Sequence, residues 1–267
     1  MNRLLVVFAV LALTGCAGLG GGGQIQEDSV TYFDGTTVMK GYIVYDASIT
    51  AKRPGVVVVH EWWGITEHTR NEARNLARQG YTAFVADMFG EGQTADNPKS
   101  AGALSGSVRK NPAAMHSRFS AARQTLAGHP TVNESRIAAI GFCFGGSVVL
   151  DMARQGVDLR GVAAFHAGLP PSGAAAAPGK VKAKVLVLNG AADPFIKPDT
   201  VEDFKKEMEA ARVDYRYINY PGAVHAFTNP AATEAGKKFN LPLAYQPEAD
   251  QQSKDEMRKF LGSVLGM

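Results

Sequence analysis

The chain has 267 residues, and 45% of them are hydrophobic, so it is long enough to bury a sizeable core. Its formal charge of +3 comes from 28 basic and 25 acidic residues that are interspersed along the sequence. No run of lysines and arginines could follow a phosphate backbone, which argues against a nucleic-acid partner. We therefore expect one globular domain with no nucleic-acid partner.

The first residues are typical of an export signal. Arg3 supplies a positive charge before an apolar run over residues 4–13, which is too short to span a bilayer. The tetrapeptide LTGC at residues 13–16 closely resembles the lipobox of bacterial lipoproteins. The resemblance implies that residues 1–15 are removed and that Cys16 carries a lipid anchor, with several acyl chains holding the protein at a membrane. The alternative is an ordinary secretory signal with an incidental cysteine.

A lipid anchor would hold the domain at the cell envelope, on the periplasmic side. Ala17 follows the anchor, and the lack of an aspartate there favours the outer membrane in an organism with two membranes. Residues 16–28 are glycine-rich and predict a flexible tether, so the folded domain is expected over residues 29–267. With Cys16 lipidated, Cys143 is the sole free thiol, which excludes an internal disulfide.

The rest of the chain predicts an α/β fold. Alternating apolar residues on either side of Asp34 and Gly35 indicate an antiparallel hairpin. Helical stretches then alternate with short apolar runs, which we take as strands over residues 55–59, 81–86, 136–140, 161–165, 183–188 and 214–220. This rhythm is typical of a mostly parallel sheet flanked by helices. Residues 245–266 predict a closing amphipathic helix, and residues 169–180 a loop to which we assign no chemistry.

The stretch GFCFGG at residues 141–146 has the spacing of the G-x-S-x-G nucleophile elbow, with Cys143 in place of serine. An apolar strand precedes it and a helical pattern follows, which is the context that the motif requires. The glycines permit a sharp turn that pushes the central side chain outward. The alternative is that Cys143 is a small buried hydrophobic residue.

A nucleophilic thiol needs a base and a group that orients the base. Asp193 and His225 each follow a predicted strand, on the same edge as Cys143, and they occur in the chain order of α/β hydrolases. The elbow also predicts two backbone N–H donors for an oxyanion, those of Phe144 and Trp62. Taken alone, an aspartate before proline is usually a turn former, and a loop histidine is usually solvated.

Other polar residues gather beside the predicted oxyanion donor. The carboxylate of Glu61 is a candidate acceptor for the thiol proton. A metal site at His60, Glu61 and His68 is the rival interpretation, but the spacing lacks H-E-x-x-H, so we expect neither metal nor cofactor. For the substrate pocket we predict His60, Trp63, Phe89, His166, Phe227 and Asn229, although packing in the core explains the aromatic residues equally well.

The stretches VVVVHEWWGI, IGFCFGGSVVL, VLNGAADPF and YPGAVHAFTNP together resemble the dienelactone hydrolase family of α/β hydrolases, from about residue 29 to the C-terminus. The resemblance implies a triad of Cys143, Asp193 and His225, with Glu61 holding the thiol proton until substrate binds. Members that cleave dienelactone clamp the substrate carboxylate with two arginines. Asn229 stands at one of those positions here and a residue near Glu91 at the other, so dienelactone is a doubtful substrate.

We therefore expect a hydrolase that cleaves an ester, lactone or thioester of a small molecule through a thioacyl-enzyme, with a monomer favoured. Acyl transfer to an acceptor other than water shares the same intermediate. The alternative from a different class is a catalytically silent envelope lipoprotein that retains the fold as a binding or scaffold protein. Arg109 is a further cation whose distance from the site the sequence leaves open.

Overall fold

The computed structural model describes residues 23–267 of the chain. The signal peptide predicted for residues 1–15 and the lipid anchor predicted at Cys16 lie outside these residues. None of the helices within residues 23–267 has the length and apolar character that crossing a membrane requires.

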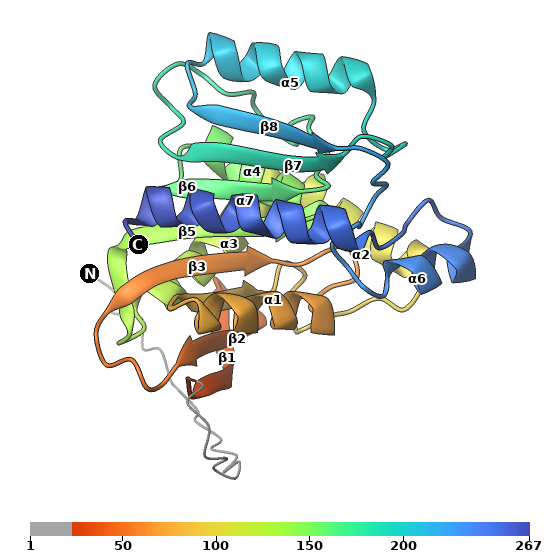
Figure 1. Ribbon diagram of the computed structural model, residues 1–267. Coiled ribbons are helices and arrows are strands. Elements are labelled where there is room, and N and C mark those ends of the chain that lie inside the picture. Colours follow the sequence, from red (N-terminus) through yellow and green to blue (C-terminus); the bar gives the residue numbers. More distant parts are fainter. Residues whose placement is uncertain (1–22) are drawn as a thin grey trace.

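Within residues 23–267, one sheet of eight strands forms the centre of the domain (Figure 1). The strands are β1 (Ile25–Asp34), β2 (Thr37–Asp46), β3 (Arg53–Val59), β4 (Thr82–Ala86), β5 (Val132–Phe142), β6 (Gly161–Phe165), β7 (Lys184–Gly190) and β8 (Tyr215–Tyr220). They lie in the order β1-β2-β4-β3-β5-β6-β7-β8. The pairs β1–β2 and β2–β4 are antiparallel and all others are parallel, which confirms the predicted mostly parallel sheet and its N-terminal hairpin.

Helices cover both faces of the sheet (Figure 1). They are α1 (Glu67–Arg78), α2 (Pro98–Arg109), α3 (Pro112–Ala127), α4 (Phe144–Arg154), α5 (Pro198–Ala210), α6 (Ala232–Phe239) and α7 (Pro247–Leu265). Side chains of α1 and α7 form one buried cluster with the sheet, and side chains of α3, α4 and α5 form a second cluster. The domain therefore has three layers with the sheet in the middle.

The strand β3 shows why the sequence selects this arrangement. Val56 and Val58 belong to the cluster with α1 and α7, whereas Val57 and Val59 belong to the cluster with α3 and α4. All four valines are fully buried. A strand that is covered on both faces needs apolar residues at successive positions, which is the origin of the unbroken valine run.

The parallel strands carry their following loops to one edge of the sheet, as the carboxyl ends of parallel strands must. The loops that leave β3, β5, β7 and β8 contain Glu61, Cys143, Asp193 and His225, respectively. Residues far apart in the sequence therefore meet at this edge.

The structure corrects one boundary of the sequence prediction and adds two helices to it. The strand β1 begins at Ile25, inside the predicted tether, because Glu27 forms ion pairs with Arg70 and Arg74 of α1 and anchors the start of the strand. The helices α2 and α6 were not predicted. The sequence of α2 is rich in glycine and serine, so its apolar pattern is weak; Asn97 caps it by accepting from the Ser100 N–H at 3.0 Å.

Candidate active site

Cys143 lies at a strained turn between β5 and α4. Its backbone has φ 54° and ψ −113°, a conformation that residues other than glycine rarely adopt. The Cys143 N–H donates to the Phe165 carbonyl at 2.9 Å, and α4 begins at the next residue. The side chain is partly exposed and lines a cavity, so the alternative of a purely structural buried cysteine does not fit.

Three glycines around the turn let the helix and strand approach each other. A Cβ added to Gly141 would lie 2.1 Å from the Gly145 carbonyl oxygen, and one added to Gly145 would lie 2.3 Å from the Val59 carbonyl oxygen. A Cβ on Gly146 would lie 2.7 Å from the Cβ of Ala167. The glycine spacing of the motif is therefore required by backbone contacts, and not only by the turn itself.

His225 and Asp193 form the buried polar pair that the sequence predicts. The Nδ1 atom of His225 lies 2.7 Å from Oδ2 of Asp193, and the Asp193 side chain is fully buried. The other oxygen of Asp193 accepts from the Phe195 N–H at 2.9 Å, which fixes the carboxylate in the loop. A carboxylate at Nδ1 orients the ring so that Nε2 is free for proton transfer.

The electrostatic setting of His225 favours its charged form. Burial opposes protonation, but the nearby Cys143 and the Asp193 carboxylate outweigh it and raise the pKa of His225 to about 10. At neutral pH the imidazole is therefore an imidazolium between two acidic partners. Such an ion can hold a proton taken from the thiol and later give it to a leaving group.

The predicted oxyanion donors come from two separate segments of the chain. Phe144 is the first residue of α4, where backbone N–H groups have no acceptor inside the helix. Trp62 lies in the loop after β3. Within residues 23–267 neither of these N–H groups donates to another backbone group, as expected of donors kept for an oxyanion.

Glu61 is buried beside this site in a polar network of its own. Its Oε2 accepts from Nδ2 of Asn229 at 2.8 Å and lies 3.5 Å from Nδ1 of His68. Burial would raise the pKa of Glu61, but the charge of His68 and these contacts lower it, and the pKa of His68 is raised in turn by Glu61 against its own burial. These directions favour the charged form of each partner, and the partners of Glu61 are Asn229 and His68, not the thiol.

The residues of the rival metal interpretation have other partners. His60 Nδ1 lies 2.6 Å from the Glu61 carbonyl oxygen, and its Nε2 accepts from the Met88 N–H at 3.2 Å. Both ring nitrogens are thus used by the backbone, and burial lowers the pKa of His60. No group of three potential metal ligands occurs within residues 23–267.

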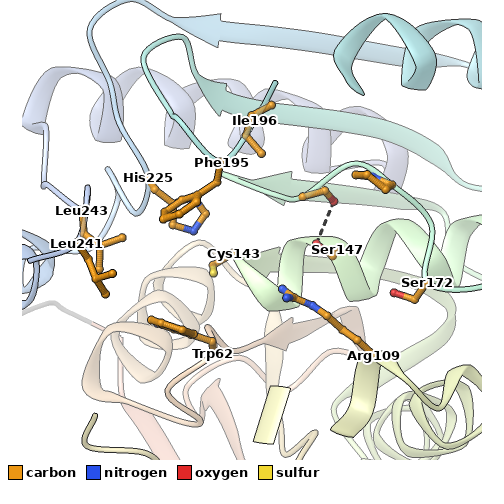
Figure 2. A pocket seen from close by; sticks show the side chains of 12 residues that line it. Trp62, Arg109, Cys143, Ser147, Ser172, Phe195, Ile196, His225, Leu241 and Leu243 are labelled. Atoms are coloured by element: carbon orange, nitrogen blue, oxygen red, sulfur yellow. Dashed lines mark hydrogen bonds between the residues drawn. The ribbon is translucent and has the colours of Figure 1, made fainter. Parts of the chain in front are cut away.

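A cavity of about 470 Å³ opens above Cys143 (Figure 2). Its apolar lining consists of Trp62, Pro170, Phe195, Ile196, Leu241 and Leu243. Its other lining residues are Arg109, Cys143, Ser147, Gly168, Ser172 and His225. A largely apolar cavity with a few polar groups and a perturbed histidine is the usual form of a small-molecule site.

The six residues predicted for the pocket do not line this cavity, so that prediction was wrong. His60, Phe89, His166, Phe227 and Asn229 are buried, and the ring of Trp63 packs at tilted angles against the rings of Trp62 and Phe239. His166 is held by Thr228 at 2.9 Å, and burial lowers its pKa well below the usual value. These residues support the catalytic loops from below.

Comparison with known proteins assigns the fold to a family. The model of the dienelactone hydrolase family matches residues 39–265. The chain belongs to the dienelactone hydrolase family. A putative carboxymethylenebutenolidase of Aquifex aeolicus (strain VF5) is 28% identical over 195 residues, which span 72% of this chain and 82% of that protein.

Solved structures agree with this assignment over most of the chain. The structure named m3DLH is 36% identical, with a TM-score of 0.85, and the match covers 91% of this chain and 100% of that one. The dienelactone hydrolase-like promiscuous phosphotriesterase P91 from metagenomic libraries is 33% identical, with a TM-score of 0.83, covering 91% and 99%. The protein is thus a carboxylic ester hydrolase of the dienelactone hydrolase type.

This member of the dienelactone hydrolase family lacks arginine at both positions of the carboxylate clamp that the family resemblance describes. Asn229 is buried and bonded to Glu61, and the Glu91 carboxylate lies at the surface, 3.7 Å from the Lys40 ammonium. Neither position supplies a cation to the cavity. Arg109, at the end of the unpredicted helix α2, does line it.

Sequence reasoning also missed the two sides of the cavity. Leu241 and Leu243 follow α6, and Pro170 and Ser172 lie in the loop to which no chemistry was assigned. These residues carry no motif, so only the fold could place them. The signal available in the sequence was their position between predicted elements that end at the catalytic edge.

Proposed function

We propose that the protein hydrolyses an ester, lactone or thioester of a small molecule through a thioacyl-enzyme on Cys143. The observation that carries the proposal is the pairing of His225 with Asp193 at 2.7 Å, next to a cysteine held in the strained elbow conformation at a cavity. A nucleophile, a base and an orienting carboxylate in this order are the parts that covalent acyl transfer needs.

In the acylation step, the thiol proton resides on His225 and the thiolate sulfur of Cys143 attacks the carbonyl carbon. A C–S bond forms, and the electron pair of the C=O bond moves to oxygen, where the N–H groups of Trp62 and Phe144 stabilise it. When the carbonyl re-forms, the bond to the leaving group breaks. Nε2 of His225 gives its proton to that leaving group.

Hydrolysis then regenerates the enzyme. The now neutral His225 takes a proton from water through Nε2, and the hydroxide formed attacks the thioester carbon. The C–S bond breaks, the acid leaves, and the thiolate and the imidazolium are restored as a pair. Asp193 keeps Nδ1 protonated throughout, which leaves Nε2 as the atom that exchanges the proton.

Glu61 is proposed as an accessory acceptor of the thiol proton. Its carboxylate accepts from Asn229 and lies 3.5 Å from Nδ1 of His68, so it can take this proton only by exchanging one of these partners.

A substrate screen tests the proposed function directly. The purified protein is incubated with a simple ester, a lactone and a thioester of matched size, and release of the free acid is followed by chromatography. We expect turnover of at least one of the three compounds. If none is hydrolysed faster than in buffer, the catalytically silent scaffold protein becomes the better explanation.

The lipid anchor at Cys16 is a separate proposal, which rests on the lipobox-like residues 13–16. Cells that express the full chain are grown with a radioactive fatty acid, and the protein is recovered from the membrane fraction. The wild type should be labelled and Cys16→Ala should not. Equal labelling of the two proteins would contradict anchoring at this cysteine.

A further inference from the structure

The cavity above Cys143 has two chemically different ends. Leu241 and Leu243 form an apolar end on one side of the cysteine, whereas Arg109 and Ser172 lie at the other end (Figure 2). A substrate that crosses Cys143 therefore meets apolar surface in one direction and a positive charge in the other.

Arg109 has no acidic partner within residues 23–267. Its guanidinium stacks over the ring of Phe144 at 5.5 Å, and Figure 2 shows the side chain extending toward Cys143 and Ser147. By contrast, Arg154 of the neighbouring helix α4 pairs with both Asp151 and Glu207. A guanidinium that lines a cavity and has free N–H donors can bind an anionic group of a ligand, such as a carboxylate.

The position of His225 assigns a role to each end. The backbone of His225 forms a bridge with that of Leu243, and Figure 2 shows the imidazole beside the thiol, on the side away from Arg109. A leaving group must lie beside the imidazole that protonates it. The alcohol part of an ester thus points to Leu241 and Leu243, and the acyl part points to Arg109.

From this geometry we propose that the preferred substrates are half-esters of dicarboxylic acids with an apolar alcohol, whose free carboxylate is bound by Arg109. The inference rests on the proposed hydrolase function and adds the substrate class and a specificity-determining residue. The proposed carboxylate site takes its cation from α2. The two positions at which the family's arginines would stand carry no cation here: Asn229 is bonded to Glu61, and Glu91 lies near Lys40.

The test compares kcat/KM for monohexyl adipate with that for the hexyl ester of adipamic acid, in which an amide replaces the carboxylate. The wild type should prefer the anionic ester by about tenfold, as expected for one hydrogen-bonded charge contact. In Arg109→Met this ratio should fall to about 1, and Arg109→Lys should keep part of it. Because Arg109 is exposed, the wild-type preference should also weaken as salt is added.

Two controls separate this effect from others. Lys110→Met removes the neighbouring exposed charge, which does not line the cavity, and should leave the ratio unchanged. The hexanoate ester of 6-hydroxyhexanoate carries its carboxylate in the alcohol part. It should have a lower kcat/KM than monohexyl adipate, which carries its carboxylate in the acyl part. Methionine at position 109 retains packing on Phe144, so loss of the ratio reports the charge.

The outcomes distinguish this inference from the hydrolase function. If the wild type cleaves the amide as well as the anionic ester, or if Arg109→Met keeps the preference, the inference is overturned and the hydrolase function stands. If the reversed ester is the better anionic substrate, the assigned orientation is wrong and the inference fails. If the wild type cleaves none of the three esters, the inference fails, whereas the hydrolase function fails only if the screen of an ester, a lactone and a thioester also shows no turnover.

Discussion

Cys143→Ala is expected to lower kcat for a neutral ester such as 4-nitrophenyl butyrate by about 10⁴-fold or more. In the proposed mechanism the substitution removes the sulfur that forms the acyl-enzyme, which leaves binding and the proposed oxyanion donors. His225 and Asp193 cannot substitute for the sulfur, because the proposed mechanism has His225 move protons through Nε2 while the 2.7 Å contact with Asp193 orients its ring. The rate of nitrophenol release measures the effect.

Ser147→Ala is the matched control for this substitution. Ser147 lines the same cavity, and its hydroxyl donates to the Gly168 carbonyl at 2.9 Å. Losing this one hydrogen bond costs about 1 kcal/mol, so activity should change by less than about tenfold. A Cys143→Ala protein that retains its unfolding free energy and a comparable kcat would remove Cys143 from the mechanism.

Gly145→Ala is expected to destabilise the fold by about 3 kcal/mol or more. The added Cβ would lie 2.3 Å from the Val59 carbonyl oxygen and 2.6 Å from the His60 carbonyl oxygen. Both are backbone atoms of the central strand and its loop, so neither can rotate away as a side chain would. The free energy of unfolding in urea measures the loss.

The same replacement at Gly102 provides the control. Nothing lies within 4 Å of a Cβ added there, in the exposed part of α2, and alanine favours a helix over glycine by about 1 kcal/mol. Gly102→Ala should therefore leave the protein as stable as the wild type or slightly more stable. If Gly145→Ala were equally stable, the close contact between α4 and β3 would not constrain the elbow.

The fold could be predicted, and the candidate triad residues could be named, because each has a local signature. Buried parallel strands are runs of apolar residues, and the elbow is a fixed pattern of glycines around Cys143. Asp193 and His225 follow strands in a set chain order, and parallel strands bring their carboxyl ends together. The hydrogen bond between these two side chains agrees with that expectation.

The cavity could not be predicted, since its walls come from segments without a pattern. Arg109 is the last residue of α2, whose many glycines and serines make its apolar pattern weak. Leu243 lies outside the predicted strands and helices, and its backbone bridge to His225 places it beside the site. The aromatic and histidine residues near the strand ends were taken for pocket walls. His166 and Phe227 instead lie in the loops after β6 and β8 and are fully buried, with their rings packed against each other at 5.5 Å between centroids.

The thioacyl-enzyme is the central claim, and its capture during turnover tests the claim most directly. The protein is mixed with excess 4-nitrophenyl butyrate and quenched in acid within the first turnovers, and its peptides are weighed by mass spectrometry. We predict a burst of nitrophenol equal to the enzyme concentration and a butyryl group on the peptide that contains Cys143, absent in Cys143→Ala. Turnover without a burst or an adduct, or a butyryl group on another residue, would contradict the account.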